Sequence, residues 1–213
     1  MTCARSGEAR GPRESACRGG WRGEAPQKRW MTSQDFKPSL LLSMPQMQDP
    51  NFARTVVLLC DYGSDGAFGL VVNRPTDMAA NEMVRLEPPI ARGNDLRLYI
   101  GGPVQPERGW ILVGEQPEIE EYRTIQEGLY LSSSPELLRQ VLDQRPAPRA
   151  RVIAGYAGWG PGQLDEELAQ SAWLIGDVEI DLIFDVEASS MWDTAIRRLG
   201  ADPSALQSSR GIH

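Results

Sequence analysis

The strongest constraint on the fold is a pair of apolar segments separated by a short stretch rich in glycine and aspartate. Residues 54–60 (RTVVLLC) are apolar and β-branched along most of their length, which predicts a central strand buried on both faces. Residues 61–66 hold two glycines and two aspartates and predict a hairpin connection. Residues 67–73 (AFGLVVN) predict the partner strand, which Pro75 ends. We therefore expect a sheet that contains an antiparallel hairpin.

Shorter signals place the remaining elements. Further strands are predicted at residues 39–44, 96–100, 110–113, 122–131, 150–156, 173–175 and 182–184. Helices are predicted at residues 76–86, from 135 onward, at 163–170 and at 190–199, with starts at Thr76, Ser134 and Ser190 and a final stop at Gly200. The strands and helices alternate irregularly and no internal repeat is visible. This pattern favours an α+β fold with a mixed, largely antiparallel sheet.

Length and charge narrow the class of protein. The chain has 213 residues with 41% hydrophobic and 24% charged side chains, which suits one globular domain with a proper core. Residues 1–30 carry seven basic and three acidic side chains, a net charge of +4. The remaining residues carry 15 basic and 26 acidic side chains, a net charge of −11. Such an acidic body repels a phosphate backbone, so direct DNA binding by the domain is not expected.

Residues 1–30 differ from the rest of the chain. They are rich in Gly, Arg, Glu and Ser and lack apolar periodicity, which predicts a disordered N-terminal extension ahead of a domain at residues 31–213. One interpretation is that Met31 is the true start and that the extension is an artefact of start-site assignment. The alternative is a basic arm that contacts nucleic acid or an acidic partner.

Cysteine usage and hydropathy indicate a cytoplasmic location. The three cysteines form no CxxC pair, and two of them lie in the N-terminal extension, which favours a reducing compartment. No apolar run approaches the roughly 18–20 residues of a membrane span, and the N-terminus lacks the apolar core of a signal peptide. We therefore expect no membrane association.

The sequence offers no recognisable catalytic centre. Its only histidine is His213, the last residue, which excludes His-ligated zinc sites and the usual Ser-His or Cys-His nucleophile pairs. We therefore assign no catalytic residue, no metal and no cofactor. Cys60 is a candidate redox residue or nucleophile, but a thiol needs a nearby cation or base to react. The competing interpretation is a buried cysteine that packs as a small hydrophobic side chain.

Two polar segments are candidate binding sites. Asn73 and Arg74 end the second strand of the hairpin, where Arg74 could clamp a carboxylate or phosphate, or instead pair with Asp77 or Glu82. Residues 158–162 (GWGPG) form the densest turn cluster and precede a helix, as phosphate-binding loops do.

The glycine-rich loop also has a purely structural interpretation. No Lys-Ser/Thr pair follows its glycines, and the three acidic residues at 165–167 would repel an anion. Those carboxylates could instead hold a cation such as Mg²⁺, or simply form a solvated helix face. The binding residues predicted from the two segments are Asn73, Arg74, Gly158, Trp159 and Gln163.

Several segments in this order resemble the AlgH/YqgE family of bacterial proteins. They are residues 41–45, 49–52, 54–59, 66–67, 69–75, 101–104, 155–159 and 162–164, together with Glu167 and Trp173. The resemblance covers residues 38–200. It implies a compact α+β fold with a bent sheet curled into a partial barrel and helices around it, in a cytosolic protein. Members are often labelled transcriptional regulators, yet the family has no recognised helix-turn-helix and this chain shows none.

The chain departs from the family pattern at two positions. Asp61-Tyr62 stands where many members have Glu-His, and Ala157 stands where Ser often precedes the Gly-Trp pair. Together these observations predict a non-enzymatic regulatory or ligand-binding protein with an unknown protein or small-molecule partner. The alternative is an enzyme or redox protein that uses carboxylates or Cys60, and a third hypothesis is DNA binding through the N-terminal extension or a dimer surface.

Overall fold

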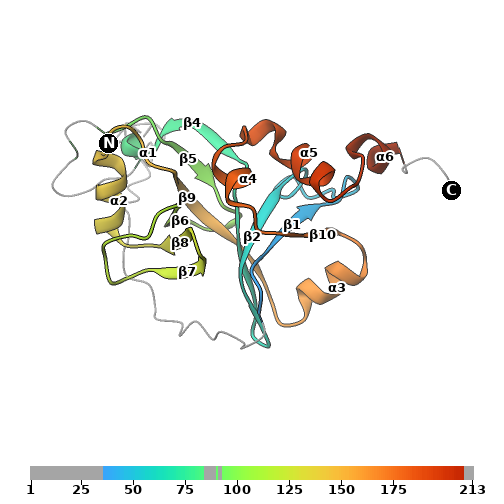
Figure 1. Cartoon of the computed structure of the whole chain (residues 1–213). Helices are drawn as coiled ribbons and strands as arrows, with labels where there is room; N and C mark the ends of the chain where they lie inside the picture. Colours follow the sequence, from blue (N-terminus) through green and yellow to red (C-terminus); the bar gives the residue numbers. More distant parts are fainter. Residues whose placement is uncertain (1–35, 84–89, 91–92, 209–213) are drawn as a thin grey trace, which may run out of the picture.

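The computed structural model describes residues 36–83, 90 and 93–208. Ten strands form the framework of the described chain (Figure 1). They are β1 (Ser39–Ser43), β2 (Val56–Gly63), β3 (Gly66–Val71), β4 (Pro75–Ala79), β5 (Arg97–Ile100), β6 (Val104–Val113), β7 (Arg123–Gln126), β8 (Leu129–Ser132), β9 (Ala150–Trp159) and β10 (Trp173–Asp177). The helices are α1 (Ala80–Met83), α2 (Pro135–Asp143), α3 (Gln163–Ala169), α4 (Ile180–Phe184), α5 (Ala188–Arg198) and α6 (Pro203–Ser208).

The long strand β9 joins two halves of the sheet. The strand order is β10-β1-β2-β3-β9-β6-β8-β7, and β5 pairs in parallel with β9 while carrying β4 on its other side. Residues 150–154 and Tyr156 of β9 pair with β6, whereas residues 157–159 pair with β3. All pairings except β5–β9 are antiparallel. The predicted α+β class with a mixed, mostly antiparallel sheet is confirmed, and the sheet bends without closing into a barrel.

The predicted central hairpin forms the middle of one half. Residues 56–60 are all buried, as expected for a strand covered on both faces. Strand β2 starts at Val56 because Thr55 still belongs to the preceding turn, where its hydroxyl donates to the carbonyl of Phe52. A register shift between Leu59 and Asp61 leaves Cys60 without a direct partner in β3. The bulge lets the hairpin bend toward the second half of the sheet.

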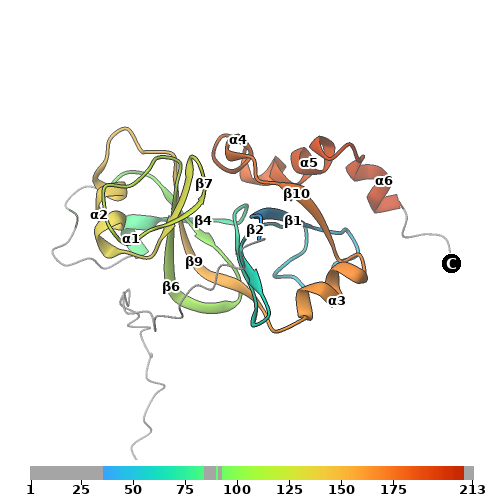
Figure 2. The same ribbon diagram turned by 60° about the horizontal axis from the view of Figure 1, so that its bottom comes forward.

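The two faces of the half built from β10, β1, β2 and β3 are covered by different helices. On one face α5 packs on Leu40, Leu42 and Leu58, and the indole of Trp192 donates to the Ser43 carbonyl at 2.9 Å. On the other face α3 packs on a cluster that includes Leu41 and Leu59. Figure 2 shows α5 and α3 on opposite sides of these strands. The alternation of β1 side chains between the two faces follows from the period of two in a strand.

Glycines let the backbones cross closely where the two halves meet. Gly102 has a φ of 151°, and a Cβ on it would lie 2.3 Å from the Tyr156 carbonyl group. A Cβ on Gly155, which has a φ of 72°, would lie 2.6 Å from the Gly102 oxygen. The Gly101 amide donates to the Ala154 carbonyl at 2.7 Å at the same crossing. Gly102 and Gly155 therefore allow the two backbones to approach each other closely at this junction, because a side chain at either position would clash.

Two predicted elements were wrong, the helix at residues 76–86 in part and the strand at residues 182–184 completely. Residues 75–79 form strand β4, because Pro75 pairs with Tyr99 and the Thr76 hydroxyl bonds to the Leu98 carbonyl instead of capping a helix. Only Ala80–Met83 is helical there, and the predicted helical residues 84–86 lie outside the described residues. Residues 182–184 belong to helix α4, whose Ile183 carbonyl accepts from the buried Arg151 guanidinium.

Helix α5 starts earlier than predicted. Helix α5 begins at Ala188, two residues before the predicted start, and the Ser190 hydroxyl donates back to the Glu187 carbonyl. The predicted disordered extension, residues 1–30, lies outside the described residues. No described helix is both long enough and apolar enough to cross a membrane.

Candidate functional site

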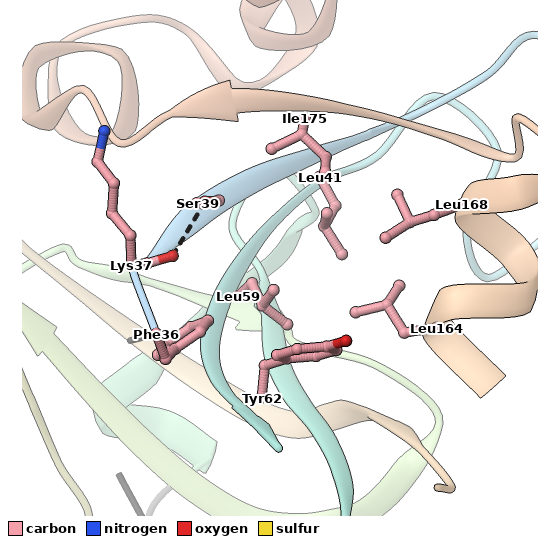
Figure 3. A pocket seen from close by; sticks show the side chains of 9 residues that line it. All are labelled: Phe36, Lys37, Ser39, Leu41, Leu59, Tyr62, Leu164, Leu168 and Ile175. Atoms are coloured by element: carbon pink, nitrogen blue, oxygen red, sulfur yellow. Dashed lines mark hydrogen bonds between the residues drawn. The ribbon is translucent and has the colours of Figure 1, made fainter. Parts of the chain in front are cut away.

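A hollow of about 380 Å³ lies between α3 and the sheet face formed by β1, β2 and β10 (Figure 3). We call it the α3 pocket. It is lined by Phe36, Lys37, Ser39, Leu41, Leu59, Tyr62, Leu164, Leu168 and Ile175. Figure 3 shows Leu164 and Leu168 of α3 facing the strand residues Leu41 and Leu59 across the hollow. Helix α3 covers only part of this sheet face, so the hollow is open to solvent.

Two polar side chains at the rim of the α3 pocket pair with neighbouring carboxylates. The Tyr62 hydroxyl donates to the Asp165 carboxylate at 2.5 Å, and this bond raises the pKa of Tyr62 above its usual value. The Lys37 ammonium donates to Asp177 at 2.6 Å, which holds the pKa of that carboxyl below its usual value. The interior of the α3 pocket is therefore lined mainly by aliphatic and aromatic carbon atoms. Such a lining favours an apolar ligand or an apolar side chain of a partner.

An aromatic cluster beside the pocket depends on one carboxylate. Oε2 of Glu167 accepts from the indole nitrogens of Trp159 at 2.9 Å and Trp173 at 2.7 Å. Its Oε1 accepts from the Gln163 side-chain amide at 2.9 Å, and the Gln163 oxygen accepts from the Gly160 amide at 3.1 Å. Both indoles are buried, so these bonds satisfy donors that would otherwise be costly. Of the five predicted binding residues, Trp159 and Gln163 thus meet at the start of α3.

Asn73 and Arg74 bond to the backbone of the turn that precedes β2. The Asn73 side chain accepts from the Val56 amide at 2.9 Å and donates to the Arg54 carbonyl at 3.0 Å. Arg74 donates to the Ala53 carbonyl at 3.0 Å, and partial burial lowers its pKa. The predicted ion pair of Arg74 with Asp77 or Glu82 is not among its described contacts. These residues fix the shape of the turn.

That turn contacts both predicted binding segments. Its Phe52 ring lies 6.4 Å from the Trp159 ring and 5.7 Å from the Trp173 ring, centroid to centroid. Asn73 and Arg74 therefore support the aromatic cluster from one side, as Gln163 does from the other. Gly158 is separate, because a Cβ on it would point toward the Tyr156 ring, away from the face that carries Trp159.

Cys60 packs in the hydrophobic core and does not line the α3 pocket. The Cys60 thiol is fully buried and lies 3.4 Å from the Leu58 carbonyl, and burial raises its pKa to about 12. Arg123 lies near enough to favour the thiolate, but this effect is smaller than that of desolvation. Within the described residues, no three His, Cys, Asp or Glu side chains gather as metal ligands.

Sequence patterns missed the pocket itself. Its lining comes from β1 and the two described residues before it, from β2, α3 and β10, and the lining residues lie up to 139 positions apart in the chain, from Phe36 to Ile175. One signal was present: Tyr62 stands at a departure from the family pattern, and it lines the pocket and bonds to α3.

Comparisons with known proteins agree with the resemblance drawn from the sequence. The AlgH-like family model matches residues 40–204. A UPF0301 protein of Myxococcus xanthus is 40% identical over 181 residues, which are 84% of this chain and 99% of that protein. A UPF0301 protein of Magnetococcus marinus is 36% identical over 167 residues, which are 78% of this chain and 90% of that one.

Two solved structures share the fold. The solution structure of the AlgH protein from Pseudomonas aeruginosa is 34% identical and covers 86% of this chain and 98% of its own, with a TM-score of 0.67. A crystal structure from Corynebacterium diphtheriae is 21% identical, covers 85% of this chain and 95% of its own, and has a TM-score of 0.61, which speaks for the fold alone. The family model matches most of the described chain, and the alignments cover at least 90% of both relatives, so this protein is a member of the AlgH-like family.

Proposed function

We propose that this protein is a non-enzymatic binding protein and that the α3 pocket is its binding site. The observation that supports this proposal is an open hollow of about 380 Å³ with an apolar interior, whose polar side chains are paired at the rim. Ligand pockets typically measure about 300–1,000 Å³ and combine an apolar lining with a few polar groups. We propose that the role is regulatory: another component of the cell recognises the protein when its ligand is bound.

In this proposal four of the five residues predicted from sequence, all except Gly158, support the pocket indirectly. Trp159 and Gln163 hold Glu167, and thereby the helix that supplies Leu164 and Leu168. Asn73 and Arg74 hold the turn that carries Phe52 against the same aromatic cluster. Substituting Asn73 or Arg74 should therefore weaken ligand binding by loosening this cluster.

The test is titration with the neutral apolar dye N-phenyl-1-naphthylamine, followed by its fluorescence. The acidic body does not repel a neutral dye, so binding reports the apolar pocket. Leu168→Trp fills the pocket and should weaken dye binding about tenfold, which corresponds to about 1.4 kcal/mol. Ala169→Trp adds the same side chain on the exposed side of α3 and should stay within about twofold of the parent protein. Absence of dye binding, or equal binding by the two variants, would reject the α3 pocket as the site.

A further inference from the structure

Strand β10 has one edge that no described strand occupies. It pairs only with β1, from Ser39↔Asp177 to Ser43↔Trp173. The Met44 amide donates to the Ala172 carbonyl at 2.9 Å at the end of this ladder. Hydrogen-bonded pairs alternate along an antiparallel ladder, so Leu174 and Gly176 bond to β1. The amides and carbonyls of the exposed residues Ile175 and Asp177 therefore face the open edge.

The β10 edge carries exposed apolar side chains on both faces of the sheet. Ile175 is 56% exposed and lines the α3 pocket, beside Leu41 of β1 (Figure 3). Leu199 is 42% exposed and lies against the opposite face of the strand, 3.4 Å from the position of a Cβ on Gly176. An added strand would cover Ile175 with one side chain and Leu199 with the next, because successive side chains alternate between faces.

The charges around the β10 edge favour a basic occupant. Asp177, Glu179 and Asp181 lie at or just beyond the end of β10, and Asp165 lies at the rim of the pocket. Two basic side chains lie in the same region: Lys37 forms an ion pair with Asp177, and Arg198 forms ion pairs with Glu179 and Asp181. Acidic side chains therefore outnumber basic ones, as they do over the whole chain with its net charge of −7. A second copy of the chain would bring the same excess of negative charge to the edge.

We propose that the β10 edge binds an extended peptide segment of a partner protein, in which two adjacent apolar residues are flanked by Lys or Arg. The segment pairs with the free backbone groups of Ile175 and Asp177 as an added strand. One apolar side chain enters the mouth of the α3 pocket, its neighbour covers Leu199, and the basic residues lie beside the acidic end of β10. The inference rests on the proposed function, since the same pocket receives the first apolar side chain.

The experiment selects a phage-displayed library of random nonapeptides on the full chain, then measures the affinity of synthetic versions of the enriched peptides by fluorescence anisotropy. We expect enrichment of adjacent apolar residues with Lys or Arg on either side. Asp177→Pro removes one edge amide, which does not bond to β1, and proline is tolerated on edge strands. Loss of one backbone hydrogen bond should weaken peptide binding about tenfold. The matched control, Asp177→Ala, removes the same exposed ion pair but keeps the amide, and should stay within about threefold.

The outcomes separate this inference from the proposed function. Dye binding with no peptide enrichment overturns the inference and leaves the pocket as a small-molecule site. Enriched peptides that bind Asp177→Pro as well as Asp177→Ala overturn strand addition, because the edge amide then has no role. If sedimentation shows dimers of the parent protein that Asp177→Pro dissociates, the occupant is a second copy and the peptide proposal is wrong. The thermal unfolding midpoints of the two variants show whether either has lost the fold.

Discussion

Glu167 shows how one side chain can determine a local structure. A single carboxylate serves two buried indoles and one amide, and these groups come from β9, β10 and the first turn of α3. Its neighbours Asp165 and Glu166 are exposed, although the sequence presents the three acids as one run. Adjacent acidic residues in one run of the sequence therefore have different structural roles.

Replacing Glu167 by Ala should lower the free energy of unfolding by about 2–4 kcal/mol. The substitution leaves two buried indole donors without their acceptor, and each unmade bond of this kind costs about 1–3 kcal/mol. Urea unfolding followed by tryptophan fluorescence measures the change. Glu166→Ala, on the exposed face of the same helix, should change stability by less than about 0.5 kcal/mol. Equal effects of the two substitutions would contradict the assigned role of Glu167.

Cys60 should react slowly in the folded protein. Its thiol is fully buried, and with a pKa of about 12 it is protonated at neutral pH. In a variant with Cys3→Ser and Cys17→Ser, labelling by 5,5′-dithiobis(2-nitrobenzoic acid) at pH 7.5 should be at least about a hundredfold slower than in denaturant, because only the thiolate attacks. Rapid labelling of the native protein would favour the alternative of a redox protein that uses Cys60.

The same thiol should make stability fall at alkaline pH. The pKa of Cys60 is raised from 9.0 to about 12 on folding, so between these values the unfolded state has lost a proton that the native state keeps. The contribution is therefore complete below pH 9 and falls by about 1.4 kcal/mol per pH unit above it. The stability difference between the parent protein and Cys60→Ala, measured by urea unfolding from pH 8 to 10.5, isolates this dependence. A pH-independent difference would show that the thiol titrates equally in both states.

At the scale of elements, β9 joins the two halves of the sheet. Its first five residues pair with β6 and β5, its last three pair with β3, and Gly155 at the bend has a φ of 72°. Gly101 and Gly102 cross this bend with no room for side chains. The orientation of the β10–β3 half, which carries the α3 pocket, thus depends on backbone contacts between glycines.

Substituting Gly102 by Ala should destabilise the protein by more than about 3 kcal/mol. The added Cβ would meet the Tyr156 carbonyl group at 2.3 Å, and alanine strains the backbone at a φ of 151°. Gly63→Ala is the matched control, because a Cβ there has no atom within 4 Å and the residue needs no positive φ. Thermal and urea unfolding compare the two variants. A Gly102 variant as stable as the Gly63 variant would mean that the junction tolerates separation of the strands.

At the scale of the whole molecule, charge limits the choice of partner. Residues 31–213 carry a net charge of −11. A body of this charge disfavours a polyanion and attracts basic peptide segments, in keeping with the binding proposed for the β10 edge.

The full chain should not bind duplex DNA measurably at about 150 mM salt and protein concentrations up to about 10 µM. Non-specific binding depends on cations that displace phosphate counterions, and the acidic body repels them. A gel-shift assay on the full chain and on residues 31–213 checks this. If the full chain alone shifts DNA, the basic residues 1–30 act as a nucleic-acid arm, and if both shift it, the charge argument is wrong.

Local patterns in the sequence were sufficient for most elements, because they depend on neighbours in the chain. The apolar run at 56–60, the Ser134 cap whose hydroxyl accepts from the Glu136 amide, and the Gly200 stop with a φ of 80° all lie where they were predicted. Local patterns predicted the wrong element where a segment far along the chain provided other bonding partners. Thr76 bonds to β5 instead of capping a helix, and helix α4 forms where the short apolar stretch at 182–184 predicted a strand.

The sequence by itself determined the fold class and the family resemblance, because composition and short-range order carry that information. Only the tertiary structure decided what the conspicuous residues do. Asn73 and Arg74 turned out to hold a turn, Glu167 to join two indoles, and Ile175 to line a pocket beside an open strand edge. Each of these roles depends on a partner far along the chain, and the pairing of distant segments is settled by packing of the whole core.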